Sequence, residues 1–164
     1  MRSEQQANRA IERYGDTVQR ICRLHLKNAA DTEDIFQTVF LKYVLSREEF
    51  ESEEHERAWI IRVAINACKD HLRHLLRGRT IPLEEAGEMA APVPEDHSEV
   101  LQAVQSLPKK YRDVVYLFYY EQYTAVEIGK ILSKPPNTIY TRLDRAKELL
   151  KQQLGGDVLE ESHL

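Results

Sequence analysis

Hydrophobic residues recur every three or four positions over most of this chain, which is the spacing of amphipathic helices. Between residues 124 and 150 the pattern predicts two helices joined by a tight turn. Thr124 can cap the first helix, and Glu127 follows at the spacing of a capping box. Pro136 suits the first position of the second helix, where no backbone donor is needed.

The second helix of this pair carries its apolar residues on one narrow stripe, formed by Ile139, Leu143, Ala146 and Leu150. Four other residues point away from that stripe: Asn137, Tyr140, Thr141 and Asp144. This is the helix-turn-helix arrangement, whose second helix can enter a DNA major groove. An ordinary helical hairpin has the same spacing. Gly129 favours the helix-turn-helix, because a glycine inside a helix costs ~1 kcal/mol and suits a close crossing.

Two helical segments precede the middle of the chain. Residues 4–28 predict one broken helix or two consecutive helices, with the break at Gly15-Asp16. A further helix is expected over residues 31–45, with Asp31 as its N-cap. Its apolar face consists of Ile35, Phe36, Val39, Phe40 and Tyr43.

Acidic residues fill the first turn of this helix, and two interpretations of them stay open. Glu33 and Asp34 favour the positive end of the helix dipole, which is sufficient reason for their presence. With Gln37 they also form a polar patch that can dock on a basic partner. Physical arguments from the sequence do not separate these alternatives.

A long helix from about Glu56 to Leu76 follows an acidic connector at 46–56. Its buried side is expected to include Trp59, Ile60, Val63, Ala67 and Leu72. Basic and polar residues line the remainder, namely Arg57, Arg62, Asn66, Lys69, His71, Arg73, His74 and Arg77. That face is either a solvated surface or a strip for a nucleic-acid backbone.

The second half begins with a short helix over Val100–Leu107, and Pro108 opens another. The buried face of the latter consists of Tyr111, Val114, Val115 and Phe118. The end of this helix is a tyrosine-rich exit that consists of Tyr119, Tyr120 and Tyr123. The side chains of these tyrosines can stack on bases or pack the small domain.

Neither an enzyme nor a metal site is expected. Cys68, His71 and His74 fall three apart, but positions i and i+6 lie about 120° apart around a helix and do not converge. The remaining His and Cys residues show no nucleophile–base spacing. Cys22 and Cys68 fit no disulfide framework, and no signal peptide or membrane span is evident, so a cytoplasmic location is expected.

With 164 residues, of which 42% are hydrophobic, the chain can form one domain or two small ones. We predict an all-α fold of two small helical domains joined by a flexible acidic linker. The expected limits are a first domain at 1–77, a linker at 78–98, a second domain at 99–154 and a frayed acidic tail at 155–164. Gly155 and Gly156 are expected to end the last helix.

The net charge of −4 conceals an uneven distribution. Residues 100–154 carry nine basic and five acidic groups, net +4, whereas residues 78–99 carry one basic and six acidic groups, net −5. The positive charge therefore lies on the helix-turn-helix segment, as phosphate contact requires. Because +4 is modest, we infer that this segment alone binds DNA weakly and needs a second anchor.

Four stretches in order resemble bacterial RNA polymerase sigma factors of the extracytoplasmic-function (ECF) type, over roughly residues 8–153. The first, similar to the polymerase-docking helix, is DTEDIFQTVF (31–40). The second, similar to the promoter-melting helix, is ERAWIIRVAINACKDHLR (56–73). The third and fourth, similar to the start and the recognition helix of the second DNA-binding domain, are SLPKKYRDVVYLFYYEQYTAVEIGKIL (106–132) and NTIYTRLDRAKELL (137–150).

The resemblance implies a protein that performs no covalent chemistry, binds core RNA polymerase and directs initiation at promoters. The implied contacts to the polymerase clamp helices are Asp31, Glu33, Asp34, Gln37 and Phe40. Contacts to the minus-ten element, which promote strand opening, are expected from Arg57, Arg62, Asn66, Lys69 and Arg73, together with the 46–56 loop. Contacts to the minus-thirty-five element are expected from Pro136, Asn137, Thr138, Tyr140, Thr141, Arg142, Asp144 and Arg145.

The implied partners are core RNA polymerase (clamp helices of the β′ subunit and the β flap), promoter DNA and a membrane-anchored anti-sigma factor, without a cofactor or small-molecule substrate. Thr38, Tyr140 and Asp144 depart from the family's usual residues, and Asp144 can accept from cytosine N4 but repels phosphates. We therefore hypothesise an unusual minus-thirty-five sequence. The alternative function is a stand-alone helix-turn-helix regulator, which explains residues 106–154 but not the acidic helix and basic helix within 31–77.

Overall fold

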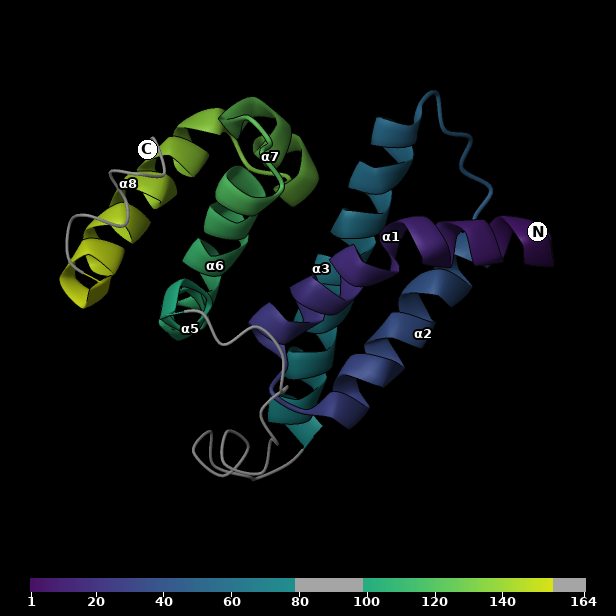
Figure 1. Cartoon of the computed structure of the whole chain (residues 1–164), viewed down its shortest axis with the longest axis horizontal. Coiled ribbons are helices and arrows are strands. Elements are labelled where there is room, and N and C mark those ends of the chain that lie inside the picture. Colours follow the sequence, from purple (N-terminus) through teal and green to yellow (C-terminus); the bar gives the residue numbers. More distant parts are fainter. Residues whose placement is uncertain (79–98, 155–164) are drawn as a thin grey trace. The chain divides into compact units, whose positions relative to one another are not determined.

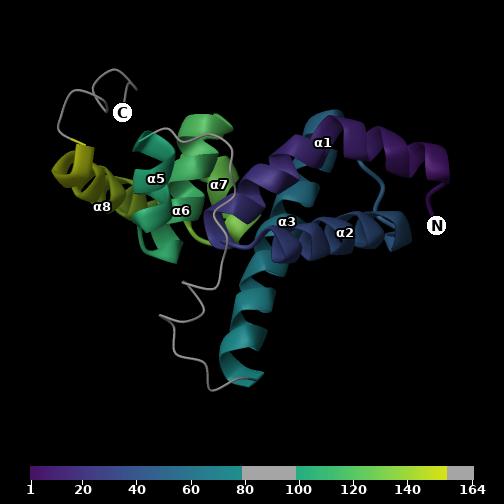
Figure 2. The same cartoon turned by 60° about the horizontal axis from the view of Figure 1, so that its bottom comes forward.

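The computed structural model describes residues 1–78 and 99–154, and every regular element in these ranges is a helix. The chain divides into two compact units. The first holds α1 (Glu4–His25), α2 (Ala29–Leu45) and α3 (Glu53–Gly78), which all pack against one another (Figure 1). The second holds α5 (Glu99–Ser106), α6 (Lys109–Val115), the π-helix η1 (Tyr116–Tyr120), α7 (Ala125–Leu132) and α8 (Pro136–Leu154) (Figure 2).

The prediction of two small all-α domains is confirmed. The predicted linker beyond Gly78 and the tail from Gly155 lie outside the described residues, so the limits of the domains stay predictions.

The first helix is continuous, so the predicted break at Gly15-Asp16 is wrong. Gly15 is buried, and a Cβ placed on it would meet the Phe36 ring at 3.5 Å. The glycine therefore lies where α2 packs closely against α1, and that tertiary contact outweighs its low helix propensity.

Two helices begin earlier than predicted, because other residues supply their caps. Asn28, not Asp31, is the N-cap of α2, and its Oδ1 accepts from the amides of Ala30 at 2.8 Å and Asp31 at 3.3 Å. The third helix begins at Glu53, where the Ser52 hydroxyl accepts from the His55 amide at 3.0 Å. Both acceptors satisfy amides that a helix N-terminus leaves without partners.

The early start of α3 turns Glu56 toward the interior of the first unit. Its carboxylate accepts from the hydroxyls of Tyr14 on α1 and Tyr43 on α2, each at 2.8 Å. Burial, and then the bond to Glu56, raises the pKa of both tyrosines, so both hydroxyls stay protonated donors to a higher pH than a free tyrosine. Glu56 thus joins all three helices of this unit.

The buried side of α3 is centred on a different set from the one predicted. Trp59, Val63 and Leu72 are only half-buried, whereas Ile60 and Ala67 are buried as expected. The side chains that fill the core of this unit from α3 are Ile60, Ile61, Ala64, Ile65 and Cys68.

In the second unit the predicted helix-turn-helix is present. Thr124 and Glu127 form the predicted capping box at the start of α7. Ser133 follows α7 as its C-cap with a left-handed φ of 58°, and the Lys134 amide donates to the Gly129 carbonyl at 2.8 Å. A Cβ on Gly129 would lie 2.6 Å from the Lys134 carbonyl oxygen, so the glycine is required by the turn itself. The predicted apolar stripe of α8 is buried throughout: Ile139, Leu143, Ala146 and Leu150.

Tyr119 and Tyr120 of the tyrosine-rich exit lie in the π-helix η1, which periodicity did not predict. Tyr116 is buried and its hydroxyl donates to the buried carboxylate of Glu121, while Tyr123 is also buried. Tyr120 stacks on Tyr116 with ring centroids 5.3 Å apart and is 54% exposed. These tyrosines therefore mainly pack the domain, with Tyr120 at its surface.

Candidate nucleic-acid interface

The exposed face of α8 carries the residues predicted to read bases. Asn137, Tyr140, Thr141 and Asp144 are all exposed, with Tyr140 at 55%. The Thr141 hydroxyl donates to the Asn137 carbonyl at 3.0 Å, so it serves the helix backbone. The Asn137 amide, the Tyr140 phenol and the Asp144 carboxylate are therefore the groups best able to contact base edges.

The negative charge of Asp144 also acts on Tyr119 in the second unit. Burial, with a smaller contribution from the negative charge of Asp144, raises the pKa of Tyr119 to about 12. The Tyr119 hydroxyl has no hydrogen-bond partner among the described residues. A carboxylate that departs from the family pattern therefore lies near a buried, unsatisfied hydroxyl.

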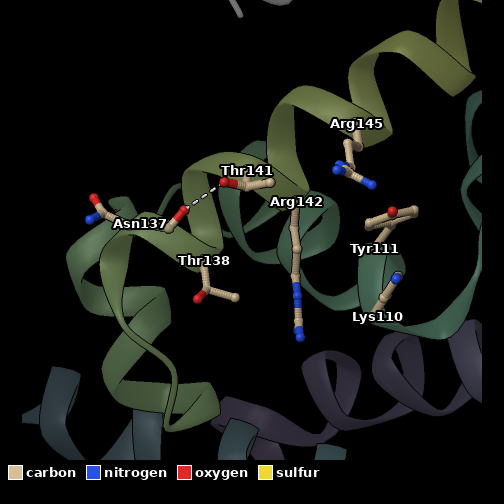
Figure 3. Close-up of a pocket in the computed structure, with 7 residues that line it drawn as sticks. All are labelled: Lys110, Tyr111, Asn137, Thr138, Thr141, Arg142 and Arg145. Atoms are coloured by element: carbon tan, nitrogen blue, oxygen red, sulfur yellow. Dashed lines mark hydrogen bonds between the residues drawn. The ribbon is translucent and has the colours of Figure 1, made fainter.

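A pocket of about 330 Å³ lies between α6 and the flank of α8 (Figure 3). Its lining combines five predicted DNA-contact residues with two residues that sequence reasoning missed: Asn137, Thr138, Thr141, Arg142 and Arg145, with Lys110 and Tyr111. Lys110 and Tyr111 were missed because nothing in the spacing of α6 indicates that its first turn faces α8.

On α3, four of the five predicted minus-ten residues share one face. Arg62, Asn66, Lys69 and Arg73 lie within about 60° of one another around the helix axis. Arg57 lies about 150° from the centre of that strip and makes an ion pair of 3.5 Å with Glu54. The structure therefore does not place Arg57 with the other four residues.

The connector before α3 is fixed in place by aromatic packing. The Phe50 ring packs against those of Tyr43, His55 and Trp59, with centroids 5.3 to 6.3 Å apart. The Arg2 guanidinium lies over the Tyr43 and Phe50 rings and donates to the Tyr43 carbonyl at 2.8 Å. The loop that was predicted to engage the minus-ten element is thus preorganised.

Of the predicted polymerase contacts on α2, some are exposed and others already contact residues of the first unit. Glu33, Asp34 and Gln37 are exposed, whereas Asp31 is half-buried with its Oδ2 3.4 Å from Nε2 of His71. Phe40 is 5% exposed and packs on Phe36, so it holds α2 in the core, and its predicted contact with polymerase stays a prediction.

Two exposed leucines extend the polar patch of α2. Leu41 and Leu45 are 59% and 58% exposed, and they continue the four-residue spacing of Glu33 and Gln37. We call Glu33, Gln37, Leu41 and Leu45 the α2 strip. The leucines could have been found from the sequence, because they lie outside the predicted apolar face of this helix.

Family models match both units of the chain. The model for sigma-70 region 2 matches residues 10–78, and the model for sigma-70 region 4 matches residues 97–150. The chain belongs to the sigma-70 family, as a sigma factor of the ECF type. Sigma factors bind core RNA polymerase and direct initiation at promoters; they are not enzymes.

Individual relatives agree with this assignment. The sigma factor is 29% identical to the ECF RNA polymerase sigma factor SigW of Bacillus subtilis (strain 168), over 88% of this chain and 86% of that protein. The solved structure of CnrH in complex with the cytosolic domain of CnrY has a TM-score of 0.66 at 19% identity, covering 94% and 91% of the two chains. RpoE in complex with the anti-sigma factor NepR from Bartonella quintana gives 0.72 at 16% identity, covering 92% and 97%.

None of the helices within residues 1–78 and 99–154 combines the length and apolar character that a membrane span requires.

Proposed function

We propose that this sigma factor uses three separate surfaces on its two units to open promoters. The α2 strip docks on the clamp helices of the polymerase β′ subunit, the exposed strip of α3 engages the minus-ten element, and the exposed face of α8 reads the minus-thirty-five element. The observation that carries the proposal is that these surfaces, apart from the half-buried Lys69, are exposed while the apolar side of the same helix is buried.

Docking on polymerase combines charge with apolar area. The acidic side chains of Glu33 and Asp34 suit a basic partner and steer the encounter. Leu41 and Leu45 then supply apolar surface, worth about 1.5–3 kcal/mol for each leucine that becomes fully buried. Phe40 contributes indirectly, because its packing on Phe36 fixes the orientation of α2.

Strand opening follows from capture of single-stranded DNA. The Arg62, Asn66, Lys69 and Arg73 strip offers three cations and an amide along one face of α3. Cations on such a face attract the phosphates of one strand, and stable binding of an unpaired strand favours the melted state. The connector fixed by Phe50 is suited to hold an unstacked base, because it need not become ordered on binding.

The two DNA contacts are weak separately and strong together. Polymerase holds both units on one promoter, so that the second contact forms at a high effective concentration. The modest +4 charge of residues 100–154 is then sufficient. We also propose control by a membrane-anchored anti-sigma factor and action in the cytoplasm. The resemblance in fold to RpoE, whose solved structure is a complex with the anti-sigma factor NepR, supports the anti-sigma partner.

A gel-shift assay tests this proposal against a regulator that binds DNA alone. The full chain is incubated with promoter DNA, either duplex or unpaired across the minus-ten region, with and without core polymerase. We expect a stable complex only with core polymerase, and a tighter one on the unpaired template. Equal binding to duplex DNA without core polymerase would contradict the proposal.

A further inference from the structure

Arg2, which precedes the first helix, is bonded to the connector that leads from α2 to α3. The Arg2 amide donates to the Val44 carbonyl at 3.0 Å. One terminal nitrogen of its guanidinium, Nη1, donates to the carbonyls of Tyr43 at 2.8 Å and Ser46 at 2.6 Å. The other terminal nitrogen, Nη2, donates to the Glu48 carbonyl. Arg2 therefore joins the end of α2 to the beginning of the connector (Figure 1).

These contacts suit an arginine and not a lysine. The guanidinium carbon of Arg2 lies 4.5 Å from the centre of the Tyr43 ring and 5.1 Å from that of Phe50. A planar guanidinium can stack on aromatic faces while its N–H groups donate to several acceptors around its edge. A lysine ammonium is a compact point charge, so it keeps the positive charge but does not combine stacking with bonds to three separate carbonyls.

The bonds of Arg2 extend beyond the end of α2. A cation at the C-terminus of a helix favours the negative end of its dipole, and such a cap adds stability alone. The bonds to Ser46 and Glu48 and the contact with Phe50 hold the connector as well. Arg47 and Glu49, which lie within this held stretch, are exposed. Arg2 thus fixes the backbone of a surface loop whose own side chains stay accessible.

We propose that Arg2 is a positioning residue for strand opening, which holds the connector in the shape that takes up an unpaired base of the minus-ten element and does not itself contact DNA. This inference rests on the proposed function, and it adds a residue that precedes the stretch 10–78 matched by the region 2 model. A connector that is ordered before binding loses less conformational entropy when the base enters, so Arg2 acts on affinity through preorganisation.

Three variants separate positioning from capping. Holoenzymes carrying Arg2→Ala, Arg2→Lys or Arg9→Gln are titrated against a promoter template that is unpaired across the minus-ten region. We expect Arg2→Ala to bind several-fold more weakly than wild type, and Arg2→Lys to bind as weakly although it keeps the charge. Arg9→Gln removes one exposed positive charge from α1 and should bind like wild type. A lysine variant with wild-type affinity would make Arg2 a helix cap only and overturn the proposal.

Coupling to individual bases gives a readout that a loss of stability does not move, because a less stable protein binds every template less well by the same factor. The unpaired templates carry a single abasic site at successive minus-ten positions. At the position held by the connector, wild-type holoenzyme should lose affinity several-fold and the Arg2→Ala holoenzyme much less. At the other positions both should lose affinity equally. If every abasic site weakens the two holoenzymes by the same factor, Arg2 does not position the connector.

A direct contact between Arg2 and a phosphate is the alternative, and the dependence of binding on salt identifies it. Positioning removes no phosphate contact, so the Arg2→Ala holoenzyme should keep the wild-type slope of log K against log salt. A slope that is shallower by about 0.7, the value for one phosphate of a single strand, would assign Arg2 to the DNA backbone and overturn the proposal.

Failure of this inference is distinguishable from failure of the proposed function. Wild-type holoenzyme without a preference for the unpaired template would contradict the proposed function itself. A preference that Arg2→Ala retains in full would leave that function intact and remove only Arg2 from it. Arg2→Ala should also bind core polymerase like wild type, and weaker binding to core polymerase would place the effect at the polymerase interface instead.

Discussion

The effect of a substitution in this protein depends on what surrounds the residue, and two of its helical glycines, Gly15 and Gly129, illustrate this. A Cβ at Gly15 would lie 3.5 Å from the flexible end of the Phe36 side chain, an ordinary contact. A Cβ at Gly129 would lie 2.6 Å from the Lys134 carbonyl oxygen, which belongs to the backbone of the turn. The same substitution should therefore have opposite effects at the two positions.

Gly129→Ala should destabilise the second unit by about 1–3 kcal/mol, because the turn that sets the angle between α7 and α8 has to shift. Gly15→Ala is the matched control, and it should leave the first unit unchanged or stabilise it by up to about 1 kcal/mol through helix propensity. Thermal unfolding followed by circular dichroism measures both. A Gly129→Ala protein as stable as the wild type would show that the turn has room for a methyl group.

Tyr119 should impose a pH dependence on the stability of the second unit. Its pKa of about 12 in the folded protein lies above the value of about 10 in an unfolded chain. The stability it contributes is therefore fully present below pH about 10 and is lost as the pH rises to about 12. Tyr119→Phe removes this titration and should lose less stability over that window.

Near neutral pH the same variant should be as stable as the wild type or more stable, because the deleted hydroxyl has no partner among the described residues. Unfolding by denaturant at pH 7 and at pH 11.5 measures both effects. Parallel losses in the variant and the wild type would contradict the role of burial at Tyr119.

Helices were predictable from the sequence where their limits and buried faces depend on residues close together in the chain. The helix-turn-helix follows from its capping box, its prolines and one apolar stripe, and all three are present. The continuity of α1 and the orientation of Glu56 depend on Phe36, Tyr14 and Tyr43, which are distant in sequence. Periodicity contains no information about such tertiary contacts, so the break in α1 was predicted wrongly.

The α2 strip makes a prediction at the scale of one element. Leu41→Glu should weaken binding of core polymerase at least tenfold, about 1.4 kcal/mol, without changing the thermal stability of the first unit. Phe40→Ala should instead lower that stability by about 3–5 kcal/mol, because it leaves a cavity beside Phe36.

Fluorescence titration of labelled protein with core polymerase, together with thermal unfolding, separates these two effects. Ile11→Glu is a control on α1, since Ile11 is 38% exposed but lies outside the α2 strip. Equal affinity of the Leu41→Glu and wild-type proteins for core polymerase would remove the strip from the interface.

At the scale of the whole molecule, two small units carry surfaces of different character, and neither explains promoter recognition alone. The sequence indicated the family because four motifs occur in the family's order, whereas each motif alone is ambiguous. The pocket was not predictable, since its lining residues on α6 lie 26 or more residues before those on α8 in the chain. The account therefore depends most on the claim that polymerase supplies the affinity that each unit lacks.

Transcription reconstituted from purified core polymerase, this chain and genomic DNA, with the 5′ ends of transcripts mapped, tests that claim most directly. We predict start sites that require both proteins and that share a minus-ten and a minus-thirty-five element upstream. The preferred bases of the minus-thirty-five element should change in Asp144→Ala. Transcripts that do not depend on this chain, or start sites without shared upstream elements, would contradict the account.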